Sequence, residues 1–139
     1  MKIMITGIAG FIGMHTALRL NELGHEVFGF DNLNNYYEPL LKKERVACLR
    51  EAGVGFRVGD LRDKLDLTDY VSNTKPDMVI HLAAMAGVRY SMSNAGEYID
   101  TNCHGTLNLI NACEASDIQN VIYASTSCVM HGNELPWGE

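Results

Sequence analysis

Three glycines near the N-terminus have the spacing of a turn that can hold a phosphate group. Gly7, Gly10 and Gly13 follow a short apolar run and open a helical pattern. The first glycine permits a tight turn, the second lets the backbone approach a pyrophosphate closely, and the third allows close packing of helix against strand. Free amides and the helix dipole then attract the phosphate charge. The spacing is G-x-x-G-x-x-G, not the G-x-G-x-x-G of the commonest dehydrogenases, so the surrounding residues must support this interpretation.

Two acidic residues stand where the adenosine half of a dinucleotide would bind. Asp31 ends the second apolar run, where a carboxylate can bind the ribose hydroxyls and repel a 2′-phosphate. Asp60 follows the third run, where a side-chain acceptor can meet the adenine amino group. The plainer alternatives are a strand-end turn residue for Asp31 and a surface turn before a helix N-cap for Asp60. The carboxylate of Asp31 therefore favours NAD over NADP as the cofactor.

A lone histidine, His81, comes near the end of the fourth apolar run, and small residues follow it at positions 82–87. Such a histidine is more often a hydrogen-bonded core residue than a ligand, so we assign it no chemistry. The small residues suit a backbone that passes close to a cofactor.

Strand and helix patterns alternate along the chain and would position these residues. The apolar, β-leaning runs are residues 2–6, 26–30, 55–58, 78–82 and 120–124. The helical patterns are residues 11–23, 39–52, 64–72 and 95–115. Parallel neighbours need a crossover, so this alternation predicts βαβ units. The expected fold class is α/β: a Rossmann-type, doubly wound parallel sheet of about five strands in the order 3-2-1-4-5.

Composition excludes several classes of protein. The 139 residues are 47% hydrophobic and 20% charged, which is ordinary for one globular domain. A net charge of −6 disfavours a nucleic-acid binder. The basic cluster Lys42, Lys43 and Arg45 is expected to be a solvated helix face. No apolar run reaches the roughly 18–20 residues of a membrane span, and no signal peptide is visible, so we expect a cytoplasmic protein. The cysteine spacing predicts reduced thiols, with neither a disulfide nor a metal site.

The motifs together resemble the extended short-chain dehydrogenase/reductases, specifically their NAD-dependent nucleotide-sugar epimerases and dehydratases. The resemblance covers essentially the whole chain. Its markers are the turn from Thr6 to Gly13, Asp31-Asn32-Leu33-Asn34, Gly59-Asp60-Leu61, His81-Leu82-Ala83-Ala84, Thr101-Asn102 with Gly105-Thr106, and residues 123–127. Segments 31–37 and 86–91 look most like UDP-glucuronate 4-epimerases, although dTDP-glucose and GDP-mannose dehydratases use much the same framework.

The resemblance implies roles for individual residues. Those implied to bind NAD are Gly7, Gly10, Phe11, Ile12 and Gly13 at the pyrophosphate, Asp31, Asn32 and Asn34 at the ribose, Asp60 and Leu61 at the adenine, Leu82, Ala83, Ala84 and Ala86 beside the cofactor, and Asn102, which orders the site. Those implied to face the sugar nucleotide are Arg89, Ser91, Ser125, Thr126 and Ser127. A surface salt bridge is the plainer alternative for Arg89. For the serine/threonine segment, the alternative is hydrogen bonding to its own backbone.

The implied reaction transfers a hydride from sugar C4 to NAD and, in an epimerase, returns it to the other face of the 4-keto intermediate. Thr126 matches the family's hydroxyl that hydrogen-bonds the reacting oxygen. In that family the base is a tyrosine with a lysine four residues later. The resemblance implies that this pair lies beyond Glu139, and no tyrosine of this chain has a lysine at that spacing.

Residues 1–139 are therefore interpreted as an incomplete NAD-binding Rossmann domain without the C-terminal substrate domain, and as inactive alone. The expected partners are a UDP-sugar and either a second copy of the chain or the missing C-terminal half. The alternatives are a nucleotide-sugar 4,6-dehydratase fragment and a non-catalytic NAD-binding module.

Overall fold

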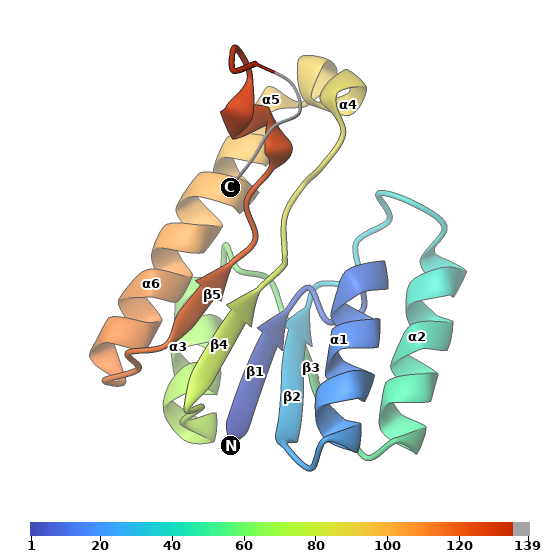
Figure 1. The fold of residues 1–139 in the computed structure, drawn as a ribbon, viewed down its shortest axis with the longest axis vertical. Coiled ribbons are helices and arrows are strands. Elements are labelled where there is room, and N and C mark those ends of the chain that lie inside the picture. The colour runs from blue at the N-terminus through green and yellow to red at the C-terminus, as the bar shows by residue number, and fades with distance from the viewer. Residues whose placement is uncertain (135–139) are drawn as a thin grey trace.

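Five parallel strands form the centre of the structure, in the spatial order β3-β2-β1-β4-β5 (Figure 1). The computed structural model describes residues 1–134. The strands are β1 (Lys2–Thr6), β2 (Glu26–Asp31), β3 (Gly55–Val58), β4 (Met78–His81) and β5 (Val121–Tyr123). The helices that follow the first three strands are α1 (Phe11–Glu22), α2 (Pro39–Glu51) and α3 (Lys64–Thr74). Both the fold class and the strand order agree with the sequence prediction.

Helices cover both faces of the sheet, and alternate strand residues supply the two cores. On one face, Met4, Phe28 and Phe30 pack with residues of α3 and of a later helix, α6 (Thr106–Ala115). On the other face, Ile3 and Ile5 pack with residues of α1 and α2. Near-continuous apolar runs are typical of parallel strands buried on both sides. The sheet is therefore doubly wound, as predicted.

The helical pattern over residues 95–115 forms one stretch with an irregular centre. The stretch consists of α5 (Ala95–Tyr98), the π-helix η1 (Ile99–Gly105) and α6. Gly105 is buried where η1 meets α6, and a Cβ there would lie 2.9 Å from Cβ of Leu61. π-helical turns occur mostly as single insertions and frequently at functional sites. The predicted extent is confirmed, but the π segment was not predicted.

A short helix, α4 (Val88–Ser93), was not among the predicted helical segments. It begins after Gly87, whose φ is 100°, and none of its residues is buried. A helix without a buried face leaves no apolar periodicity in the sequence, which explains why the pattern missed it.

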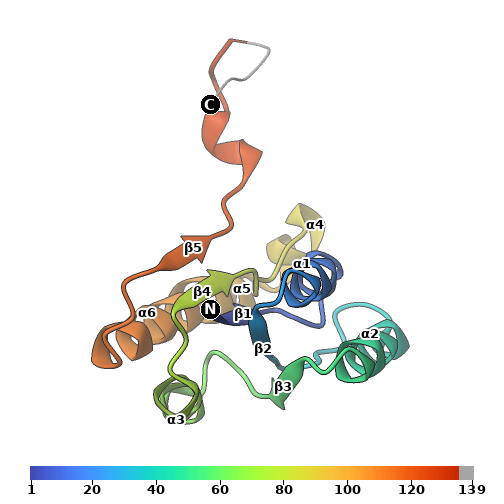
Figure 2. The same cartoon turned by 60° about the horizontal axis from the view of Figure 1, so that its bottom comes forward.

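β5 forms an exposed edge of the sheet. It pairs only with β4 among the described strands, and Val121, Ile122 and Tyr123 are 42%, 51% and 58% exposed. Figure 2 shows the chain after β5 projecting away from the helical layers, through the 3₁₀-helix η2 (Ser127–Met130). Within residues 1–134, no helix combines the length and the apolar character that a bilayer crossing requires.

Candidate functional site

A cavity opens at the carboxyl ends of four neighbouring strands. Gly7 follows β1, Asp31 ends β2, Gly59 follows β3 and Leu82 follows β4, and all four line it. Its other lining residues are Gly10, Phe30, Asn32, Asn34, Tyr36, Tyr37, Lys42, Asp60, Leu61, Ala83, Ala84, Met85 and Thr101. Ligands of open α/β sheets bind at this edge, where neighbouring crossovers diverge. The fold thus brings most of the residues predicted for the cofactor into one place.

The glycine turn is held tightly against its neighbours. Gly7 has a φ of 72°, and its amide donates to the carbonyl of Phe30 at 2.8 Å. A Cβ on Gly7 would come within 2.8 Å of the backbone of Ala83, in the loop after β4. A Cβ on Gly13 would overlap the carbonyl oxygen of Gly7. Gly13 therefore allows close packing against the turn itself, whereas the predicted contact was with the strand.

At the start of α1, backbone amides rather than side chains are available to bind a ligand. Gly10 is the N-cap and supplies no side-chain hydrogen bond. The first amides of a helix have no intrahelical acceptor, and they face outward from its N-terminus. Phe11 and Ile12 have side chains that are 66% and 65% exposed and do not line the cavity. Any contact of these two residues with a phosphate is therefore expected to come from the backbone.

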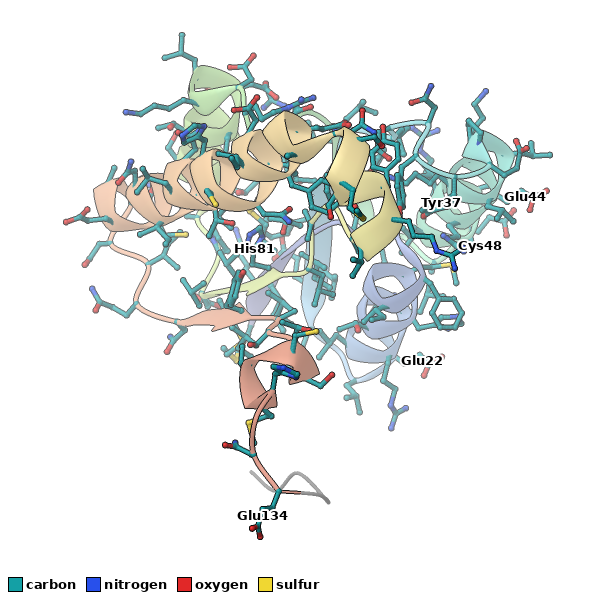
Figure 3. The ribbon with its side chains drawn as sticks, turned by 90° about the horizontal axis from the view of Figure 1, so that it is seen from above. Glu22, Tyr37, Glu44, Cys48, His81 and Glu134 are labelled. Atoms are coloured by element: carbon teal, nitrogen blue, oxygen red, sulfur yellow. The ribbon has the colours of Figure 1, made fainter. Side chains whose placement is uncertain are left out.

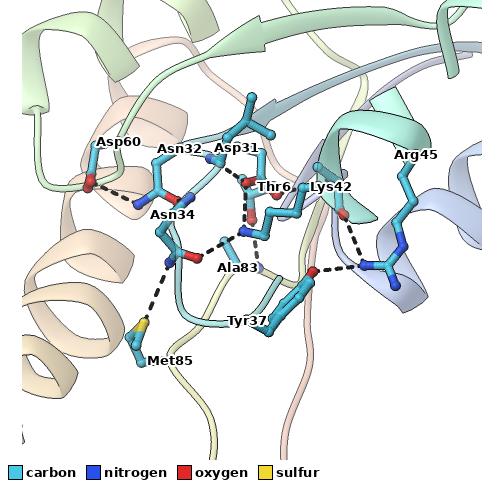
Figure 4. Close-up of polar contacts among 12 residues, drawn as sticks. Thr6, Asp31, Asn32, Asn34, Tyr37, Lys42, Arg45, Asp60, Ala83 and Met85 are labelled. Atoms are coloured by element: carbon cyan, nitrogen blue, oxygen red, sulfur yellow. Dashed lines mark hydrogen bonds and ion pairs between the residues drawn. The ribbon is translucent and has the colours of Figure 1, made fainter. Parts of the chain in front are cut away.

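Asp31 is buried and connects the turn to the segment after β2. Its Oδ2 accepts a hydrogen bond from the amide of Ala9 at 3.1 Å, and its Oδ1 accepts one from the amide of Leu33 at 2.8 Å. Lys42 Nζ donates to the same Oδ1 at 3.2 Å (Figure 4). Asp31 thus lies in the cavity as predicted, and it also holds the glycine turn and the segment after β2 together.

The prediction of a solvated helix face is wrong for two of the three residues in the basic cluster of α2. Lys42 is buried, and Arg45 is half-buried, with Nη1 donating to the hydroxyl of Tyr37 at 2.8 Å and to the carbonyl of Ala9 at 3.4 Å. Within this cluster, only Lys43 is exposed. Lys42 lies one helical turn before Val46 and two turns before Leu49, which are both buried. This spacing places Lys42 on the same face of α2, toward the sheet.

Asp60 is held in its ionised form by a neighbouring arginine and an amide. Arg62 donates to both carboxylate oxygens, from Nε at 2.9 Å and from Nη2 at 2.7 Å. Asn32 Nδ2 donates to Oδ2 at 2.9 Å. These bonds, the one from the Arg62 side chain foremost, lower the pKa of Asp60 to about 2. An ionised acceptor at the predicted adenine end of the cavity follows from this arrangement.

The loop after β4 is anchored by side chains from other segments. Asn102, in η1, accepts from the amide of Met85 at 2.8 Å and donates to its carbonyl at 2.9 Å. Tyr36 and Tyr98 both donate to the carbonyl of Ala86, at 2.5 Å and 2.6 Å. Asn102 and Ala86 do not line the cavity, but they position the residues that do. The two tyrosines were missed, although Tyr36 lies in a segment that the resemblance had singled out.

His81 is a satisfied core residue, as predicted. Nδ1 is 2.6 Å from Thr6 Oγ1 and Nε2 is 2.9 Å from Thr106 Oγ1, and Figure 3 places the ring between α6 and the sheet. Thr6 Oγ1 accepts from the amide of Ala83 at 3.3 Å, so its own proton is free for Nδ1, and Nε2–H then donates to Thr106. Burial lowers the pKa of His81 to about 4. The ring is therefore neutral near pH 7.

The residues predicted for the sugar nucleotide lie outside the cavity. Ser125, Thr126 and Ser127 are exposed, and Thr126 Oγ1 accepts from the amide of Cys128 at 3.2 Å. This is the backbone-binding alternative considered above. Arg89 is exposed on α4 and forms no ion pair with any residue in the described range, and Ser91 Oγ donates to the carbonyl of Val88 at 2.7 Å. Their roles toward a substrate remain predictions. No group of His, Cys, Asp or Glu within residues 1–134 is arranged to hold a metal ion.

A parallel sheet in this order, with a glycine turn after its first strand and an acid at the end of its second, defines a Rossmann-type dinucleotide-binding domain. The model of the NAD dependent epimerase/dehydratase family matches residues 3–136. The chain belongs to that family.

Individual relatives agree with this assignment. The chain is 43% identical over 133 residues to Protein CapI of Staphylococcus aureus, and 41% identical over 142 residues to a probable UDP-glucuronate 4-epimerase of Rhizobium meliloti. These matches cover 96% and 100% of this chain, but 40% and 41% of the two relatives. The crystal structure of UDP-glucose 4-epimerase from Bifidobacterium longum in complex with NAD⁺ and UDP superimposes with a TM-score of 0.85 at 29% identity, covering 100% of this chain and 41% of that one. The chain thus spans about two-fifths of the length of these relatives.

Proposed function

We propose that residues 1–139 are the NAD-binding part of a nucleotide-sugar 4-epimerase of the UDP-glucuronate type. The observation that carries the proposal is the cavity in which the glycine turn, Asp31 and Asp60 meet at the carboxyl ends of the strands. The relatives named as UDP-glucuronate 4-epimerases support the choice of substrate.

Different residues of the cavity fit the pyrophosphate, the ribose and the adenine of NAD. The tight packing at Gly7 and Gly13 leaves room for no side chain, so the backbone and the uncapped start of α1 face the pyrophosphate. Asp31 and Asn34 serve the ribose, and Asp60 accepts a hydrogen bond from the adenine amino group in place of one of its four bonds from Arg62 and Asn32. NAD, when bound, supplies a hydride acceptor and donor for the sugar carbon. The residues of this chain bind and orient it.

The residues of this chain supply binding but not the base. Thr126 is the hydroxyl proposed to hydrogen-bond the reacting oxygen, with Ser125 and Ser127 beside it. Arg89 and Ser91 are proposed to face the sugar nucleotide. None of the six tyrosines has a lysine four residues later, so no residue here matches the family's base. The chain by itself is therefore expected to bind NAD without turning over a UDP-sugar.

The edge at β5 is the surface on which the expected partner packs, whether a second copy of the chain or the rest of an epimerase. Apolar residues gather there, with Ile110 of α6 beside Val121 and Tyr123 of β5. We propose that the protein works in the cytoplasm, where its NAD and UDP-sugar would be available.

Calorimetric titration of the folded chain tests the proposal. NAD is expected to bind, and binding is expected to weaken strongly in Gly13→Val. Addition of UDP-glucuronate is expected to release heat of binding but to yield no C4 epimer by chromatography. NAD binding without any binding of the sugar nucleotide would favour the non-catalytic module. A folded chain with no affinity for NAD would refute both.

A further inference from the structure

Lys42 places a buried ammonium group at the ribose end of the cavity. Its side chain is 8% exposed and that of Asp31 is 4% exposed, and both residues line the cavity. Lys42 Nζ lies 3.2 Å from Asp31 Oδ1 and 3.1 Å from Asn34 Oδ1 (Figure 4). A lysine this deeply buried is expected to be paired, because an isolated charge is strongly disfavoured away from water.

Most of the hydrogen-bonding positions of Lys42 and Asp31 are filled by neighbouring groups in the described part of the chain. A carboxylate has about four lone-pair positions. Asp31 fills three of them with Ala9, Leu33 and Lys42, which leaves about one for a ribose hydroxyl. An ammonium group carries three donors, and Asp31 and Asn34 take two of those of Lys42. One donor of Lys42 is left over at the point where a ribose hydroxyl would bind.

The net charge at this end of the cavity depends on Lys42 as well as on Asp31. A bare carboxylate would repel a 2′-phosphate, but Asp31 lies against a cation, so the pair has no net charge. Arg45 is not an alternative cation, because it binds Tyr37 and Ala9 and does not line the cavity. The third basic residue, Lys43, is exposed on α2.

We propose that Lys42 is the residue through which this site distinguishes NAD from NADP. Asp31 selects NAD by holding Lys42 in an ion pair, and Lys42 becomes a binding group for the 2′-phosphate of NADP once the negative charge of Asp31 is removed. The inference rests on the proposed function, since it takes the cavity to bind a dinucleotide.

A double-mutant cycle at these two residues tests the proposal. NAD and NADP are titrated by calorimetry into the unmodified chain, Asp31→Asn, Lys42→Met and Asp31→Asn/Lys42→Met, each checked for folding by circular dichroism. Asp31→Asn is expected to weaken NAD binding and to strengthen NADP binding by at least about tenfold. The double variant is expected to lose that gain. Lys43→Met, one residue along the same helix but exposed, is the matched control and should behave as the unmodified chain does.

Equal NADP affinity in Asp31→Asn and in the double variant would overturn the proposal, because the gain would then not depend on Lys42. Failure of Asp31→Asn to gain any NADP affinity would overturn it too. If the Asp31 variants do not fold, Lys42→Met decides with Asp31 intact. The ratio of NADP to NAD affinity must then fall by at least about threefold, since the carboxylate is no longer compensated, and Lys42→Arg must restore it.

An unchanged ratio in Lys42→Met would again overturn the inference. These results are separable from the proposed function. A folded, unmodified chain that binds no NAD contradicts the function itself. A chain that binds NAD with no dependence on Lys42 contradicts only the role of this lysine.

Discussion

The side chain of Asn102 pairs with both backbone polar groups of Met85. Its Oδ1 accepts from the amide at 2.8 Å and its Nδ2 donates to the carbonyl at 2.9 Å. Asn102 lies within the π-helical segment η1, and Met85 lines the cavity after β4. The irregular helix thus reaches the cofactor side of the site through one side-chain amide, which satisfies both backbone polar groups of Met85.

Asn102→Ala is expected to weaken NAD binding and to lower the free energy of unfolding. Both polar groups of Met85 lose their partner, and each such loss in a part-buried place costs about 1–3 kcal/mol. Urea unfolding and calorimetry measure the two effects. Asn73→Ala, on the exposed end of α3, is the control. Equal stability and NAD affinity in Asn102→Ala and the control would contradict the anchoring role.

Gly13→Ala is expected to destabilise the chain by at least about 2 kcal/mol and to reduce NAD affinity, because the new Cβ would overlap the carbonyl oxygen of Gly7. Gly96→Ala is the matched control. A Cβ on Gly96 meets nothing within 4 Å, and the residue lies in α5, where alanine is the better helix former. Thermal unfolding compares the two variants. A Gly13→Ala chain as stable as Gly96→Ala would show that the turn can open without loss.

Stability is expected to fall as the pH is lowered from about 6.5 to about 4, because of His81. Its pKa is lowered from 6.5 to about 4 in the folded chain, so the unfolded chain takes up a proton first as the pH falls. The stability that a neutral, buried ring contributes is therefore complete above 6.5 and lost toward 4, by about 3 kcal/mol in all.

Chemical unfolding at several pH values measures this loss. His81→Gln should remove much of the slope, whereas His131→Gln, at an exposed position, should keep it. Asp60 adds a separate, more acidic window. Its pKa is lowered from 3.8 to about 2, so its contribution is present above 3.8 and is lost between the two values. A slope unchanged by His81→Gln would assign the pH dependence elsewhere.

Asp60→Ala is expected to abolish the preference for an adenine base. An ionised acceptor favours NAD, whose adenine carries an amino donor, over deamino-NAD, whose base presents a carbonyl instead. The unmodified chain should therefore bind NAD about tenfold more tightly than deamino-NAD, and the variant should bind the two equally. Competition titrations measure the ratio. An unmodified chain with no preference would place the adenine elsewhere in the cavity.

The strands and their order were predictable because both faces of the sheet are covered, which leaves continuous apolar runs between turn residues. The location of the cavity was predictable too, because it lies at the carboxyl ends of the strands. The environment of Lys42 was not predicted, because a basic cluster on a polar helix usually faces water. Its spacing from Val46 and Leu49 was the available signal, since the three share one face of α2.

Other features left weaker traces in the sequence. α4 has no buried residue, so no periodicity marks it. The π-helical turn of η1 accompanies contacts of Asn102 and Gly105 with segments far away in the chain, which local patterns do not encode. The short-range contact of Thr126 with Cys128 was, by contrast, foreseen as an alternative because it needs only neighbouring residues.

One carbonyl oxygen, that of Ala86, receives the hydroxyls of Tyr36 and Tyr98, which come from segments on either side of it in the chain. Displacing this stretch of backbone therefore breaks two hydrogen bonds at once. A substitution of one tyrosine is also expected to shift the segment that carries the other, because both bond the same oxygen. The loop after β4 is thus held at Ala86 from two segments, and we expect it to keep its position when a molecule binds in the neighbouring cavity.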